Sequence, residues 1–91
     1  MGFQWDDAKD AANEAKHGIQ FIQAVQIFRS PILKVRDDRH DYGEQRFVAL
    51  GIFDGTVLSV AFTERDGDIR LISARKASKN ERKIFEKHQK R

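Results

Sequence analysis

Two Asp-Gly pairs constrain the fold of this chain more than any other feature. Asp54-Gly55 and Asp66-Gly67 each separate two runs that are rich in apolar and β-branched residues. Asp and Gly tolerate the left-handed backbone that a two-residue hairpin turn requires. The two pairs therefore predict a three-stranded antiparallel meander. Its strands are expected at residues 46–53, 57–63 and 68–76.

The residues before the meander predict a first helix over residues 7–17. Asp6 is a good N-cap, and the stretch contains no Pro, Gly or β-branched residue. Gly18 follows at the position where a left-handed residue ends many helices. Three alanines share one side of this helix, and we expect that side to pack inward. They are Ala8, Ala12 and Ala15.

The remaining elements complete one α+β domain that spans residues 1–91. A second helix is expected from Phe21 to Ser30, because Pro31 disfavours helical backbone in the residue before it. A capping box at Ser78 and Glu81 starts a third helix. Short strands are expected at 3–5 and 32–36. The order β-α-α-β-β-β-β-α predicts a small antiparallel sheet with an N-terminal helical hairpin and a C-terminal helix, with the helices on one face.

Composition excludes several classes of protein. The chain has no Cys, which excludes disulfides and thiolate metal sites. Its three His are too scattered for a metal-binding pair and it has no Gly-rich phosphate loop, so no metal or cofactor is expected. No apolar run approaches the roughly 20 residues of a membrane-spanning helix. Because the N-terminus lacks a signal-peptide pattern, we expect a cytoplasmic location.

Positive charge is concentrated at the C-terminal end of the chain. The formal net charge is +3, yet from Arg70 onward nine Lys and Arg face only two Glu. A basic end on a small domain predicts a nucleic acid or an acidic protein as partner. A solvated C-terminal helix accounts for the same charge count.

Several side chains suit RNA cleavage without a metal, which needs a base, an acid and cations at the phosphate. His17 closes the first helix, where the helix dipole favours imidazolium, so it is a candidate acid or base. It also suits the role of a polar helix cap. Glu44 and Glu64 are candidate bases, and each also suits a surface ion pair with Arg46 or Arg65.

Four arginines on three expected strands could clamp a phosphate through their planar guanidinium groups. Side chains alternate along a strand, so Arg70 and Arg75 are predicted to lie on opposite faces unless the strand bulges. We therefore favour Arg75, near the strand end, as the site residue. The four arginines are Arg46, Arg65, Arg70 and Arg75.

These residues form a pattern that resembles the BrnT-like toxins of type II toxin–antitoxin systems. The resemblance covers nearly the whole chain, and its most specific blocks are Lys16-His17-Gly18-Ile19 and Ile72-Ser73-Ala74-Arg75. The other matching residues are Trp5-Asp6, Lys9, Asn13, Phe21, Asp38, His40, Glu44, Arg46-Phe47, Thr63-Glu64-Arg65, Arg70 and Glu81-Arg82.

The resemblance implies a RelE-like ribonuclease fold, RNA cleavage that arrests growth, and neutralisation by a cognate antitoxin with a ribbon-helix-helix part. Operator DNA is then bound only through the antitoxin complex. Our catalytic hypothesis is His17, Glu44, Arg46, Glu64, Arg65 and Arg75. The residues expected to bind RNA are Lys9, Lys16, Arg70, Lys76 and Arg82.

The sequence leaves open the role of the Phe85 position and whether the domain is catalytic at all. Relatives commonly have Tyr where this chain has Phe85, so that Tyr is structural in the family or activity is weaker here. A non-catalytic module that binds nucleic acid or an acidic partner through the basic C-terminal strand and helix would carry the same charge.

Overall fold

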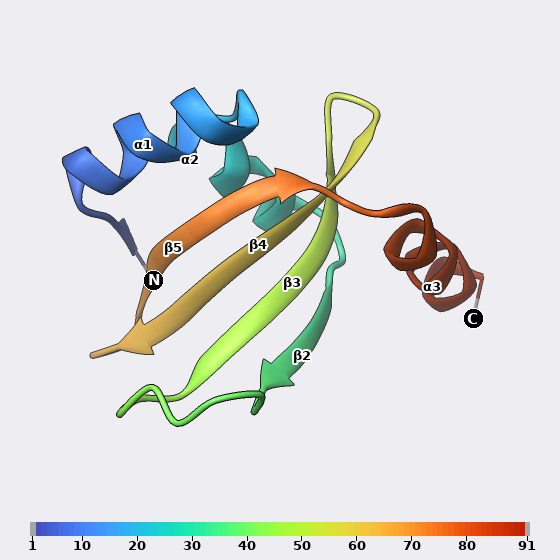
Figure 1. Cartoon of the computed structure of the whole chain (residues 1–91). Coiled ribbons are helices and arrows are strands. Elements are labelled where there is room, and N and C mark those ends of the chain that lie inside the picture. Colours follow the sequence, from blue (N-terminus) through green and yellow to red (C-terminus); the bar gives the residue numbers. More distant parts are fainter. Residues whose placement is uncertain (1, 91) are drawn as a thin grey trace.

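The computed structural model describes residues 2–90 and confirms the expected order of elements, as Figure 1 shows. The second helix is a single α-turn that continues as a 3₁₀ helix. The elements are β1 (Phe3–Gln4), α1 (Asp7–His17), α2 (Phe21–Ala24), η1 (Val25–Arg29), β2 (Leu33–Asp37), β3 (Arg46–Phe53), β4 (Thr56–Arg65), β5 (Asp68–Lys76) and α3 (Lys79–Gln89).

The five strands form one sheet in the order β1-β5-β4-β3-β2. Strands β2 to β5 pair antiparallel, but β1 runs parallel to β5, with Phe3 opposite Ile69 and Gln4 opposite Arg70. The expectation of a wholly antiparallel sheet is therefore wrong, and the sheet is mixed. A strand of two residues has no pattern that reveals its partner or direction, so the sequence could not indicate this pairing.

Both Asp-Gly pairs form the predicted hairpin turns. Asp54 and Gly55 have φ of 50° and 77°, and Asp66 and Gly67 have φ of 51° and 83°. Two successive residues with positive φ match the twist of the flanking strands. These turns fix the register of the meander, in which Phe53 faces Thr56 and Arg65 faces Asp68.

Helix α1 begins and ends where the sequence indicates, but it docks through a different side. The Asp6 carboxylate accepts bonds from the N–H groups of Ala8 and Lys9, and Gly18 ends the helix with φ of 72°. The alanine side is exposed, so the prediction that it packs inward is wrong. Polar side chains turn inward instead, and Asp10 accepts a bond of 2.8 Å from the Phe21 N–H.

The main core lies between the sheet and the segment α2–η1, which Figure 1 shows behind the sheet. Its fully buried side chains include Phe21, Ile27, Val60, Phe62 and Leu71. Burial of an aromatic or branched side chain of this size stabilises a domain by roughly 1.5–3 kcal/mol.

A second, smaller core holds α3 against the other face of the sheet. Phe85 packs with Leu50 and Ala77, whereas the neighbouring Ala49 belongs to the main core. Successive strand residues point to opposite faces, so the expectation that all helices share one face is wrong. Phe85 is a buried packing residue in this chain. No helix within residues 2–90 is long and apolar enough to cross a membrane.

Candidate functional site

A bulge in β5 decides which side chains share a face of the sheet. Ala61 lies opposite Ser73 while Phe62 lies opposite Leu71, so β5 contains one extra residue at Ile72. An extra residue interrupts the alternation of side chains along a strand. Arg70 and Arg75 consequently lie on the same face, and the prediction of opposite faces is wrong.

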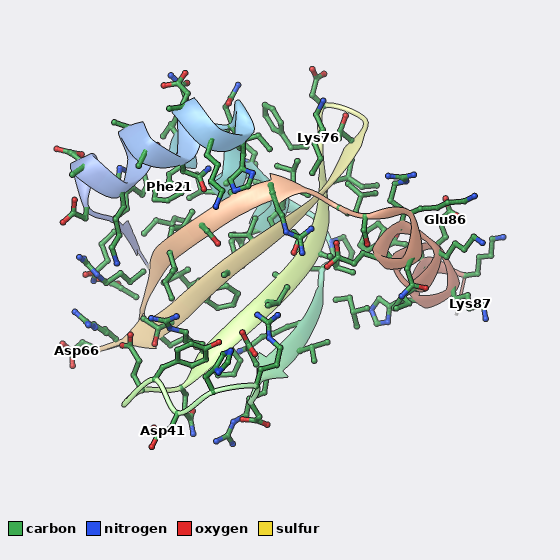
Figure 2. The ribbon with its side chains drawn as sticks, in the orientation of Figure 1. Phe21, Asp41, Asp66, Lys76, Glu86 and Lys87 are labelled. Atoms are coloured by element: carbon green, nitrogen blue, oxygen red, sulfur yellow. The ribbon has the colours of Figure 1, made fainter. Side chains whose placement is uncertain are left out.

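This face of the sheet points away from α2. It also carries Arg46 and Arg65, and we call it the arginine face. The register places Arg70 opposite Thr63 and Arg75 opposite Ser59 on β4. Thr63 in turn faces Arg46 on β3, and Arg65 lies two residues further along β4. Figure 2 shows Asp41 and Asp66 at one end of the sheet and Lys76 at the other.

Arg46, Thr63 and Arg70 form a row across three neighbouring strands. Strands lie about 4.8 Å apart, so the two arginine backbones are about 10 Å apart and both guanidinium groups can reach one group above Thr63. Within residues 2–90 no carboxylate forms an ion pair with Arg46 or Arg70. Arg70 donates to the Gln4 side-chain oxygen at 3.1 Å.

The Nε atom of Arg46 is buried and has no hydrogen-bond partner among residues 2–90. A buried donor without an acceptor costs about 1–3 kcal/mol. An anion that accepts a bond from this Nε would remove this cost. Asp37 lies opposite Arg46 on β2, but its carboxylate is bonded to Arg39. The row therefore keeps the charge and the unused donors of an anion-binding site.

The loop between β2 and β3 holds Arg46 in place. The Tyr42 ring stacks on its guanidinium, with the Cζ atom 3.9 Å from the ring centroid. The Tyr42 hydroxyl donates to Asp37 at 3.4 Å, and Arg39 donates two bonds of 2.9 Å to the same carboxylate. These bonds, that of Arg39 foremost, lower the pKa of Asp37 to about 2. The sequence does not indicate a role for Tyr42, because its loop has no periodicity, although it is the only Tyr in the chain.

The two candidate bases lie on different faces. Glu44 pairs with Arg65 at 3.4 Å beside the arginine row. Glu64 points to the core face, like Phe62, and pairs with Lys34 at 2.7 Å. The sheet therefore separates Glu64 from the arginine row, whereas Glu44 lies next to it.

Arg75 is already neutralised by α3. It donates two bonds, of 2.7 and 3.0 Å, to Glu81. Glu81 also accepts a bond from the Ser78 N–H in the predicted capping box. The bonds from Arg75, and less strongly those from Ser78, hold the pKa of Glu81 at about 2.

His17 lies in a separate cavity of about 270 Å³ between α1 and the β5 edge. Lys9 and Lys16, which the sequence predicts to bind RNA, also line this cavity. The residues Ile72 and Ser73 at the bulge line it as well. This α1–β5 cavity shares no residue with the arginine row. It lies on the Arg70 side of the row, because β5 is the strand that borders both.

The other two basic residues lie apart from both sites. Lys76 borders a cavity beside Gly18 and Asp54. Arg82 donates to the Ala77 carbonyl at 3.0 Å and so supports the start of α3. Within residues 2–90 no cluster of three His, Asp or Glu side chains could hold a metal ion.

Comparison with known proteins agrees with these observations. Residues 5–81 match the family model described as "Ribonuclease toxin, BrnT, of type II toxin-antitoxin system". The crystal structure of the Brucella abortus ribonuclease toxin BrnT is similar, with a TM-score of 0.67 and 29% identity. The match covers 87% of this chain and 99% of that one. No curated protein sequence matches. The chain belongs to the family of BrnT ribonuclease toxins of type II toxin–antitoxin systems.

Proposed function

We propose that this protein is an endoribonuclease that cleaves RNA without a metal and thereby arrests growth. The arginine row is the observation that supports it best, because Arg46 and Arg70 flank Thr63 on one face and neither has a carboxylate partner within residues 2–90. In this proposal the fold is RelE-like, and a cognate antitoxin with a ribbon-helix-helix part neutralises the protein. Operator DNA is contacted through the antitoxin.

The scissile phosphate lies above Thr63, between Arg46 and Arg70. Negative charge grows on the phosphoryl oxygens as the 2′ oxygen attacks, and preorganised cations stabilise that charge most in the transition state. The planar guanidinium of Arg46 is fixed by Tyr42 and so loses little freedom when it binds.

Glu44 accepts the proton of the 2′-hydroxyl. The 2′ oxygen then bonds to phosphorus, the bond from phosphorus to the 5′ oxygen breaks, and the 5′ oxygen takes a proton. Glu44 lies at the β3–β4 side of the row and the α1–β5 cavity at its other side. In this proposal His17 donates this proton from the side opposite the base. The products are a 2′,3′-cyclic phosphate and a 5′-hydroxyl.

Purified chain, free of any partner, should cleave single-stranded RNA in the presence of EDTA. The expected product ends are a cyclic phosphate and a 5′-hydroxyl, identified by mass spectrometry. A folded chain that binds RNA without cutting it would instead support the non-catalytic binding module. Dependence on added Mg²⁺ would refute the proposed chemistry.

Expression of the chain alone should stop growth, and co-expression of the protein encoded by an adjacent reading frame should restore it. The Glu44→Gln variant serves as control, because it keeps the side-chain shape but removes the base. Growth arrest by this variant equal to that of the wild type would show that toxicity is not due to the proposed cleavage.

A further inference from the structure

The two edges of the sheet differ in whether other segments hydrogen-bond to the backbone of the edge strand. At the β5 edge, the buried Asn13 side chain donates to the Ala74 carbonyl at 2.8 Å and accepts from the Ala74 N–H at 3.0 Å. One carboxamide thus completes the backbone bonding that a further strand would provide. The short strand β1 pairs with Ile69 and Arg70 near the start of this edge.

The edge formed by β2 has no such cover. Within residues 2–90, the backbone groups of β2 bond to β3 and to no other segment. An open edge strand readily pairs with another chain, and proteins commonly cover or interrupt such edges. The open β2 edge is therefore a docking position for an extended segment.

An apolar groove runs beside this edge on the arginine face. It comprises two cavities, of about 310 and 330 Å³, that share Leu33 and Ile84 in their linings. Val35 is 55% exposed and Ile84 is 46% exposed, although both are large apolar side chains. Val48 and Leu50 also line the larger cavity. We call this surface the β2–α3 groove.

Lys87 is the charge at the β2–α3 groove that favours a carboxylate on the occupant. The three carboxylates of the groove are each paired with an arginine. Lys87 borders the groove, yet in the described part of the chain it has no ion-pair partner. The paired carboxylates are Asp37, Asp38 and Glu81.

We propose that an extended segment of the antitoxin pairs with β2 as a sixth strand and fills the β2–α3 groove. Strand addition supplies main-chain bonds, while alternate side chains enter the adjacent groove. The segment has apolar residues toward Val35 and Ile84 and a carboxylate toward Lys87. Only the identity of the partner rests on the proposed function, since the groove itself is independent of RNA cleavage.

This position explains how the antitoxin blocks activity. Arg39, which fixes the Tyr42 loop through Asp37, lines the same groove. Arg36 and Glu81, the partner of Arg75, line it too. A bound segment therefore lies across one border of the arginine face and excludes RNA from it.

Two substitutions test the groove with the adjacent-frame protein as the probe. Val35→Glu and Ile84→Glu place a charge where the segment packs, and each should weaken binding at least about thirtyfold. Ile22→Glu is the matched control, because Ile22 is 54% exposed on α2, behind the sheet. It should bind like the wild type. Equal binding by all three variants, each with wild-type melting, would refute the proposal.

Hydrogen exchange identifies strand addition itself. Complex formation should slow exchange of amides in residues 33–37, and protection confined to α1 or α2 would refute the position. Self-association of the chain without the probe, abolished by Val35→Glu, would instead assign the groove to a second copy. Free Val35→Glu should cleave RNA like the wild type. Loss of binding with no cleavage by either protein would contradict the ribonuclease function but support the groove.

Discussion

Two rows of side chains on the arginine face contain arginine. They differ in whether the arginine is paired with a carboxylate. In the first row Arg46 and Arg70 flank Thr63, and neither has a carboxylate partner within residues 2–90. In the second row Arg75 faces Ser59 and is held by Glu81 of α3. The same residue type thus serves as an available cation in one row and as a structural link in the other.

The difference shows that the number of arginines does not locate an anion site. A bidentate carboxylate partner satisfies the donors of Arg75, so a phosphate would have to displace Glu81. Arg46 has an unused buried donor and is fixed by an aromatic ring. Unsatisfied donors in a fixed geometry are therefore the more specific indication of ligand binding.

The largest expected effect is that of Arg46→Ala. Removal of one preorganised donor to a transition-state anion typically costs about 10²–10³ in rate, and we expect a loss in kcat/KM in this range. Arg46→Lys should recover only part of it, because ammonium lacks the fork geometry. Steady-state cleavage of an RNA oligonucleotide measures both, with thermal melting as the control for folding. Full activity in folded Arg46→Ala would remove the first row from the mechanism.

His17→Ala should reduce RNA cleavage by about a hundredfold, the lower range for loss of a general acid. A nucleoside 3′-(p-nitrophenyl phosphate) has a leaving group that needs no proton, so this variant should cleave it at nearly the wild-type rate. Arg46→Ala should be impaired on both substrates. If His17→Ala loses equally on both, His17 binds or positions the substrate and does not act as the acid.

The smallest effect concerns stability in the second row. The pKa of Glu81 is depressed to about 2, so its ionised form stabilises the fold above the ordinary Glu value near 4.5. That stabilisation is lost as the pH falls from about 4.5 toward 2. Glu81→Gln should therefore lose less stability than the wild type between pH 6 and pH 3, measured by urea denaturation. An identical loss would mean that the ion pair with Arg75 contributes nothing to folding.

Local signals in the sequence were sufficient for most of the fold. The Asp-Gly turns, the Asp6 cap and the Ser78 capping box depend on neighbouring residues and were correctly located. Long-range pairings were not predictable in the same way. The parallel strand β1 and the Asn13 bridge to Ala74 join residues more than 60 positions apart.

In the candidate site, too, local signals are predictable and the long-range arrangement is not. The resemblance and the charge pattern indicate Arg46, Arg70, Glu44 and His17 as site residues. One extra residue in β5, however, reverses the predicted face of Arg75 relative to Arg70. A bulge of one residue in an apolar strand has no reliable sequence signal, since Ile72 suits either position. Tyr42 could not be found from a periodic pattern because it acts from an irregular loop.

The comparison between Arg70→Ala and Arg75→Ala tests the central claim most directly. Both substitutions remove one guanidinium from the same strand and the same face of the sheet, so the change in net charge is identical. We expect Arg70→Ala to lower kcat/KM for RNA by about a hundredfold, and Arg75→Ala to change it by no more than a few-fold. An equal loss in both folded variants, or a larger loss in Arg75→Ala, would contradict the assignment of the phosphate to the row of Arg46, Thr63 and Arg70.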